Sequence, residues 1–243
     1  MARPTDRRNS PRYTVQLPCL HKPMDAVPAR PRAGWTRNLS EGGICLELVE
    51  SVEAQTPLHI RLRTDQGLLE TEVQVIWTGR PVLPSGGILH GVAFTQAPTH
   101  QLRAVQDLLV SNALFRPAGV RLPFEVGVVC GLKSGTGPAL DGGTRNIGRG
   151  GALVRLPQIL SLGTAVELTL RTSPGPLTAE GTVVWVAPPE GRTLGKPIRH
   201  GLRFTAFDWV SLVALAFALT ELPKKPGAQG NHAIRNDVLL ERS

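Results

Sequence analysis

The sequence predicts a mainly β protein that consists of two consecutive small antiparallel barrels, each followed by a C-terminal helix. The first observation is an internal repeat: residues 36–43 (TRNLSEGG) recur as residues 144–151 (TRNIGRGG). Asn38 aligns with Asn146, so the offset is 146 − 38 = 108 residues. The second is a series of short segments in which apolar and polar residues alternate, with no βαβ pattern between them. A repeat this long indicates a duplicated domain, since solenoid repeats have periods of roughly 20–50 residues.

The strands of the first half are predicted from alternation. In residues 58–63, Leu58, Ile60 and Leu62 alternate with polar side chains, as in a strand with one buried face. Residues 44–48 show the same alternation, and residues 72–77 place Val73, Val75 and Trp77 on one face. Residues 91–94 form the last predicted strand of this half.

The second half repeats these segments in the same order. Residues 58–64 align with 166–172 and residues 75–77 with 183–185, both at an offset of 108. Residues 90–94 align with 200–204 at 110, so one loop is two residues longer in the second half.

A helix is predicted at the end of each half. The first covers residues 99–115, and the second runs from about Trp209 to Leu222, before Pro223. The second helix is expected to cover its own barrel, although its apolar surface would also suit an interface. The predicted domains are therefore residues 1–115 and 116–222, followed by a flexible tail at 223–243.

Composition restricts the compartment and the partners. The net charge of +8 favours partners that carry phosphate: nucleic acid, membranes or nucleotides. The three cysteines form no CxxC motif, which indicates neither a disulfide framework nor a zinc site and is typical of the reducing cytoplasm. No signal peptide is expected, and the longest apolar segment, residues 210–219, is shorter than the roughly 20 residues that cross a bilayer.

The repeated segment contains candidate binding residues. Asn38 and Ser40 are two residues apart, so on an extended chain their side chains point to the same face and can reach one ligand. Gly43 permits a sharp turn or the close approach of a ligand. The alternative interpretation is an Asx or Ser turn that leads into the next strand. Arg37 is expected to point to the opposite face and, because it recurs as Arg145, to be structural or solvated.

A second group of candidates precedes the first strand. Arg7, Arg8 and Arg12 lie in a polar segment, and Arg8 and Arg12 are four residues apart. A guanidinium group binds phosphate bidentately, stacks on bases and can address the O6/N7 edge of guanine. The alternative interpretation is a solvated basic terminus.

Together these two groups resemble the signature of the PilZ family, bacterial receptors for cyclic di-GMP. The signature, Arg-x-x-x-Arg followed by Asp/Asn-x-Ser-x-x-Gly, is matched here by Arg8 and Arg12 and then by Asn38, Ser40 and Gly43. The resemblance covers about residues 7–110. It implies a six-stranded antiparallel barrel and a regulatory ligand.

The resemblance also implies the roles of individual residues. Arg8 and Arg12 would clamp guanine and phosphate, and Asn38 and Ser40 would bond the base or a nearby phosphate. The implied ligand-binding residues are Arg7, Arg8, Arg12, Asn38, Ser40, Gly42 and Gly43. The implied ligand is cyclic di-GMP, with no metal.

The second half resembles the family less closely. Gly148 stands where the first half has Ser40, and the equivalent of Arg12 is Arg121 while that of Arg8 is Pro117. Weak or no ligand binding is therefore expected there, and packing, dimerisation or contact with a partner is the expected role.

With this resemblance, the sequence predicts a cytoplasmic cyclic di-GMP-binding regulatory protein and not an enzyme. The resemblance also associates it with motility or biofilm regulation, although no residue selects the downstream process. A protein partner and a homodimer are the expected assemblies. One alternative is a tandem-barrel adaptor that binds no ligand. Another is a basic nucleic-acid-binding protein, which the sparse aromatic residues, 1 Tyr, 6 Phe and 4 Trp, make less favourable.

Overall fold

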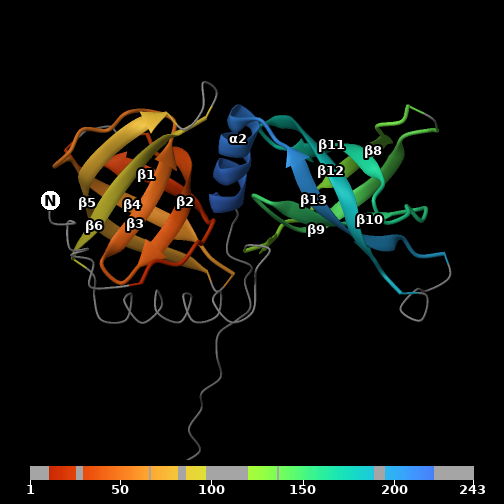
Figure 1. The fold of residues 1–243 in the computed structure, drawn as a ribbon, viewed down its shortest axis with the longest axis horizontal. Coiled ribbons are helices and arrows are strands. Elements are labelled where there is room, and N and C mark those ends of the chain that lie inside the picture. Colours follow the sequence, from red (N-terminus) through yellow and green to blue (C-terminus); the bar gives the residue numbers. More distant parts are fainter. Residues whose placement is uncertain are drawn as a thin grey trace, which may run out of the picture.

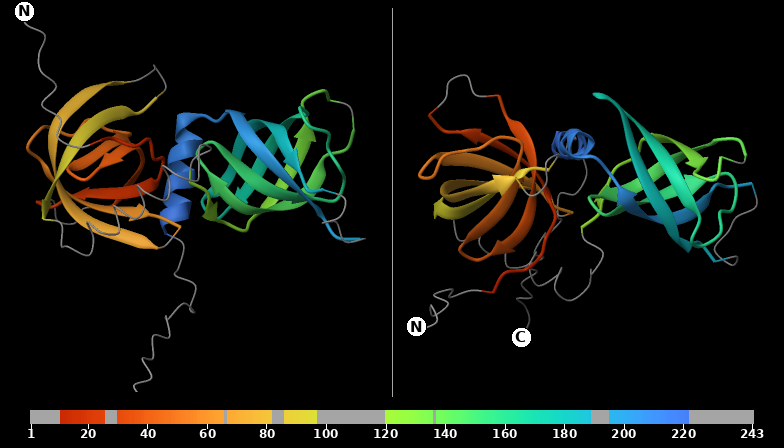
Figure 2. Two further views of the ribbon diagram at one scale, coloured as in Figure 1. Left: turned by 60° about the horizontal axis from the view of Figure 1, so that its bottom comes forward. Right: turned by 45° about the horizontal axis from the view of Figure 1, so that its top comes forward.

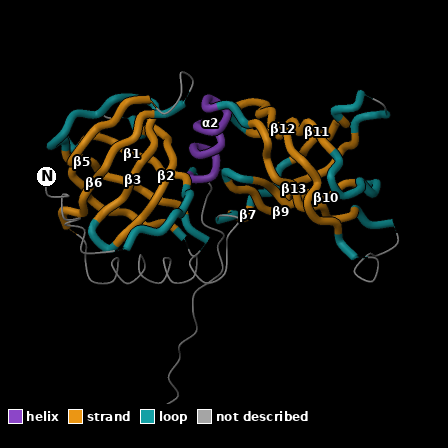
Figure 3. The backbone as a smooth tube through the Cα atoms, in the orientation of Figure 1, coloured by secondary structure: helices purple, strands orange, loops and turns teal. Residues whose placement is uncertain are grey.

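The computed structural model describes residues 11–25, 30–65, 67–81, 86–96, 120–135, 137–188 and 195–221. Within these ranges two β-barrels lie on either side of one helix, α2 (Figure 1). Figure 3 shows the same arrangement as a tube, in which the strands of each barrel wind around a separate interior.

The first barrel is closed in the order β1-β2-β3-β6-β5-β4, and neighbouring strands are antiparallel. Its strands are β1 (Pro18–Pro23), β2 (Arg32–Ser40), β3 (Gly43–Leu48), β4 (Pro57–Arg63), β5 (Leu68–Pro81) and β6 (Ile88–Gln96).

The second barrel repeats this topology as β8-β9-β10-β13-β12-β11, and β7 adds a short extension beside β9. The strands are β7 (Leu122–Pro123), β8 (Gly127–Leu132), β9 (Leu140–Gly148), β10 (Gly151–Leu156), β11 (Ala165–Thr172), β12 (Gly175–Val186) and β13 (Ile198–Ala206). The predicted fold class, two tandem six-stranded barrels, is confirmed.

Alternation predicts the buried face of most strands, and β4 is the clearest case. Leu58, Ile60 and Leu62 are fully buried, whereas the residues between them are partly exposed. In β5 the pattern breaks because the register shifts between Val75 and Trp77. A bulge of this kind turns the following side chain to the other face. The prediction that Trp77 shares the core face of Val73 and Val75 is therefore wrong, and Trp77 is 40% exposed.

The threonine of the repeated segment holds the chain that precedes each barrel. The Thr36 hydroxyl accepts a hydrogen bond from the Leu17 amide, 2.9 Å away, and donates one to the Val15 carbonyl. Thr144 does the same in the second barrel, with the Val126 amide at 3.0 Å and the Phe124 carbonyl. Both hydroxyl groups are buried, so these paired bonds satisfy backbone groups that water cannot reach.

Helix α2 (Trp209–Thr220) follows the second barrel but packs mainly against the first. Its N-terminus is capped by Asp208, whose carboxylate accepts a hydrogen bond from the Ser211 amide at 2.9 Å. Its buried residues include Leu212 and Leu215, and the helix lies against β1 and β2 (Figure 2). The indole N–H of Trp35, on β2, donates to the Leu212 carbonyl at 2.8 Å.

The expectation that α2 covers its own barrel is therefore wrong. A physical reason lies in the repeat itself, because the second-barrel equivalent of Trp35 is Gly143, which has no side chain for a helix to pack on. The helix predicted at residues 99–115 lies outside the described residues. No helix in the described ranges is long and apolar enough to cross a membrane.

His21 makes the stability of the first barrel depend on pH. Burial, followed by the charges of Arg32 and His90, lowers its pKa from 6.5 to about 4. Between these values the unfolded chain binds more protons than the folded one, so the free energy of unfolding falls as the pH drops from 6.5 to 4. The full shift is worth about 3 kcal/mol, at 1.36 kcal/mol per pKa unit.

We expect urea titrations at pH 7, 5.5 and 4.5 to show this loss. His21→Leu should make the free energy of unfolding depend less on pH. The remaining dependence should come from His90, because burial also lowers the pKa of His90. The exposed-face variant His59→Gln is the control. An unchanged pH dependence in His21→Leu would contradict the assignment.

Candidate functional site

The candidate site is a row of residues across the outer face of the first barrel. Asn38 on β2 lies opposite Cys45 on β3, Cys45 lies opposite Gly91 on β6, and Gly91 lies opposite Trp77 on β5. Their neighbours Leu39, Leu46 and Val92 point into the core, so this row faces outward. With strands about 4.8 Å apart, the four residues of the row span roughly 14 Å.

A bulge in β2 adds Arg37 to this face. The register with β3 passes from Thr36 to Asn38, so Arg37 is the extra residue. Its guanidinium lies 3.5 Å from the Glu47 carboxylate, and Glu47, two residues from Cys45 on β3, is on the same outer face. The prediction that Arg37 points away from Asn38 is therefore wrong. The bulge was not visible in the sequence because alternation assumes an uninterrupted strand.

Ser40 lies at the turn between β2 and β3. Its hydroxyl donates to the Gly43 carbonyl at 3.1 Å and its side chain is almost fully buried. This contact is the one that the turn interpretation predicts. The hydroxyl oxygen retains the capacity to accept a further hydrogen bond.

Gly43 is required by the packing of the barrel. A Cβ atom there would lie 2.1 Å from the Val92 carbonyl oxygen on β6, and the equivalent Gly151 would place one 2.1 Å from the Leu202 carbonyl oxygen. The close approach at Gly43 is therefore to a neighbouring strand. Gly42, by contrast, has open space where a Cβ atom would stand.

Arg12 lies close to this face. It is exposed and precedes Tyr13, which forms a two-bond bridge with Leu39 of β2, at 2.9 and 3.0 Å. Burial raises the pKa of the Cys45 thiol, while the positive charges of Arg37 and Arg12 act in the opposite direction. Both cations are thus within electrostatic reach of the middle of the row. Arg7 and Arg8 lie outside the described residues.

Trp77 also lies in this row, although its sequence pattern placed it in the core. Its indole covers Gly91, where a Cβ atom would lie only 1.9 Å from the indole nitrogen, so the ring rests in the space that the glycine leaves. The neighbouring Ile76 is also exposed. The signal in the sequence was the recurrence of a Trp and a Gly in both halves, since Trp185 lies opposite Gly201 in the second barrel.

The equivalent position in the second barrel is closed. A Cβ atom at Gly148, the counterpart of Ser40, would lie 2.2 Å from the Val120 carbonyl oxygen. The next residue, Arg121, has its guanidinium 3.2 Å from the Cβ position of Gly151, and burial lowers the pKa of Arg121. Val120 and Arg121 thus fill the space beside these two glycines.

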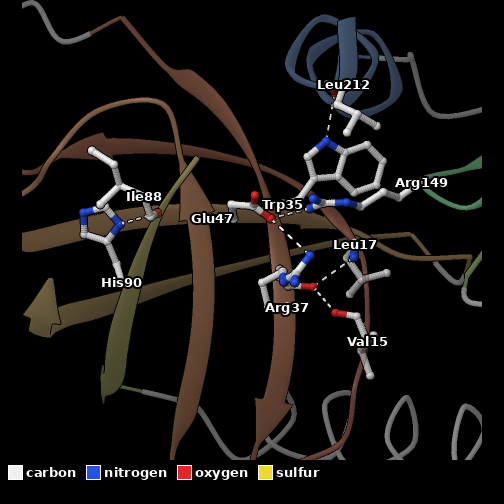
Figure 4. A network of polar contacts seen from close by, with 10 residues as sticks. Val15, Leu17, Trp35, Arg37, Glu47, Ile88, His90, Arg149 and Leu212 are labelled. Atoms are coloured by element: carbon white, nitrogen blue, oxygen red, sulfur yellow. Dashed lines mark hydrogen bonds and ion pairs between the residues drawn. The ribbon is translucent and has the colours of Figure 1, made fainter. Parts of the chain in front are cut away.

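The second barrel instead reaches the first through its degenerate motif. Arg149, in the turn between β9 and β10, forms an ion pair with Glu47 at 2.7 Å (Figure 4). Its guanidinium carbon also lies 6.0 Å from the ring centroid of Trp35 and 5.6 Å from that of Trp209, within cation–π range. The side chains of Glu47 and Arg149 are only 4% and 13% exposed.

The repeated histidines belong to the fold. His90 accepts a hydrogen bond from the Val52 amide at 3.0 Å through Nε2, so Nδ1 carries the proton, 3.0 Å from the Ile88 carbonyl. His200 repeats this arrangement. Among the described residues, no group of three His, Cys, Asp or Glu side chains could hold a metal ion.

Comparison with known proteins identifies one family. The sequence model of the PilZ domain matches residues 6–111 and again residues 115–217. No curated protein matches the chain in sequence.

Several solved structures resemble the chain. The PilZ domain of Escherichia coli YcgR with c-di-GMP is 18% identical, with 44% of this chain and 91% of that chain covered and a TM-score of 0.38. Bacillus subtilis MotI/DgrA, an inhibitor of motility, is 10% identical over 84% of this chain and 96% of that chain, with a TM-score of 0.34. The K. pneumonia MrkH complex with c-di-GMP is 12% identical, with 77% and 79% covered and a TM-score of 0.30.

We expect Gly43→Ala to destabilise the first barrel, because its methyl group would overlap the Val92 carbonyl. The loss in the free energy of unfolding should be about 1–3 kcal/mol or more, as for other overpacked sites. Gly42→Ala, which meets open space, is the matched control and should change stability by less than about 0.5 kcal/mol. Urea denaturation of both variants measures these free energies. Equal stabilities of the two variants would show that the barrel accommodates a methyl group at Gly43.

Proposed function

Because the chain belongs to the PilZ domain family, we propose that it is a regulatory receptor for cyclic di-GMP and binds the nucleotide on the outer face of the first barrel. The observation that carries the proposal is the row from Asn38 to Trp77, flanked by Arg12 and Arg37. Two of the similar structures, from YcgR and MrkH, are described as containing c-di-GMP.

The residues of this face suit the chemistry of the ligand. Cyclic di-GMP carries two phosphodiester charges and two guanine bases. Arg12 and Arg37 offer charge-assisted hydrogen bonds to phosphate or to the guanine edge, and Asn38 offers an amide donor and acceptor. The exposed Trp77 ring offers a stacking surface for a base. By the family motif, Arg8 and Arg7 join Arg12 as clamp residues, and Ser40 accepts a hydrogen bond from the ligand.

The second barrel has a different role in this proposal. Its motif lacks the serine, its Arg121 lies over its own glycine, and its turn residue Arg149 docks on the first barrel. It therefore serves as a docked companion domain that binds no nucleotide.

The protein acts as a regulator and not as an enzyme in this proposal. A receptor for an intracellular second messenger works in the cytoplasm, and the free, buried state of Cys19, Cys45 and Cys130 agrees with that compartment. Its output passes to a partner protein in motility or biofilm control.

A calorimetric titration with cyclic di-GMP tests the site. We expect the wild-type chain to bind and Arg12→Ala to bind about 10- to 100-fold more weakly, since a charge-assisted hydrogen bond contributes roughly 1.5–3 kcal/mol. Arg145→Ala is the matched control, because Arg145 forms an exposed ion pair with Glu125 on the second barrel. Absence of binding by the wild type, or wild-type affinity in Arg12→Ala, would refute the proposal.

Trp77 gives an independent test. If a guanine stacks on the indole, Trp77→Ala should weaken binding by about 1–3 kcal/mol, the usual range for base–aromatic stacking. Trp185→Ala removes the equivalent ring of the second barrel, which is 42% exposed, and should leave the affinity unchanged. Equal losses in both variants would show that neither ring marks the binding face.

A further inference from the structure

One carboxylate connects the candidate site to the second barrel. Glu47 on β3 receives Arg37 of the first barrel at 3.5 Å and Arg149 of the second at 2.7 Å, both on the same oxygen, Oε2 (Figure 4). Arg37 is the bulge residue next to Asn38, so it belongs at once to this ion-pair group and to the candidate ligand face.

The two arginines differ in how firmly they are held. Arg149 is 13% exposed and lies against the rings of Trp35 and Trp209, whereas Arg37 is 38% exposed and lies at the longer distance. Arg149 is thus the fixed partner of Glu47. Arg37 is the cation that is free to turn towards an anionic ligand.

Glu47 itself has a strong requirement for a cation. Its side chain is 4% exposed, and a buried carboxylate without a partner is strongly unfavourable. Among the described residues, the other cation that contacts Glu47 is Arg37, which would be its partner if Arg149 were absent. Glu47 would then pair with Arg37 alone and hold its guanidinium away from the ligand.

We propose that Arg149 is a positioning residue for the nucleotide, acting from the second barrel: by neutralising Glu47 it leaves Arg37 available to bind the ligand's phosphate. This inference rests on the proposed function of the first barrel. The degenerate motif of the second barrel then contributes to ligand affinity without contacting the ligand. The contribution exists because the repeat carries Arg149 where the first half carries Glu41.

The test is a set of calorimetric titrations of the full chain with cyclic di-GMP. We expect Arg149→Ala to bind about tenfold more weakly, within the range of measured couplings between interacting residues. Glu47→Gln, which removes the charge that competes for Arg37, should bind at least as tightly as the wild type. The double variant Glu47→Gln/Arg149→Ala should match Glu47→Gln.

The affinity of Glu47→Gln distinguishes this role of Arg149 from a merely structural one. If Arg149 acted only by docking the barrels through Glu47, Glu47→Gln would itself weaken binding, because it breaks the same ion pair. Arg149→Lys, which keeps the positive charge, should retain most of the affinity. Arg171→Ala is the control, since Arg171 forms an exposed ion pair with Asp141 on the second barrel.

Each outcome decides the inference. A wild-type chain that does not bind the nucleotide overturns the proposed function and this inference together. A wild type that binds, with Arg149→Ala equally tight, overturns this inference alone. If Arg149→Ala does not fold, the affinities of Glu47→Gln and of the double variant are compared instead. A double variant that binds the nucleotide more weakly than Glu47→Gln contradicts the proposed role of Arg149.

Discussion

A carboxylate buried between two domains must be paired with a cation, and the junction of this protein is organised around that constraint. Glu47 is almost fully covered and takes Arg149 from the second barrel as its close partner. Buried ion pairs contribute little net stability by themselves, because desolvation offsets the attraction. The apolar contact of α2 with the first barrel and the bond from Trp35 to Leu212 hold the junction, and the ion pair fixes how Arg149 enters it.

The duplication explains which residues serve the fold and which have diverged. The threonine, the last glycine and the histidine of each repeat make the same contacts in both barrels, as Thr36 and Thr144 illustrate. The positions that differ lie at the junction and at the candidate ligand face. Trp35 corresponds to Gly143, Ser40 to Gly148 and Glu41 to Arg149. The last of these exchanges gives the second barrel the turn residue that docks on the first.

The strand content and the barrel topology could be predicted because alternation and a family signature are local properties of the sequence. The orientation of Arg37 and Trp77 could not, since Arg37 is the extra residue of a bulge in β2 and Trp77 follows a bulge in β5. The destination of α2 also depends on a distant residue, because Trp35 lies on the other barrel. Long-range packing of this kind leaves no periodic signal, and the pairing of Glu47 with Arg149 is a further example.

The most direct test of the central claim is a map of backbone and indole NMR shifts in the full chain during titration with cyclic di-GMP. Binding on the outer face of the first barrel predicts saturable shifts at Asn38, Cys45, Gly91 and the Trp77 indole. The equivalent row of the second barrel, Asn146, Leu153, Gly201 and Trp185, should stay unchanged. Shifts centred on the second row, or none in either, would contradict the claim.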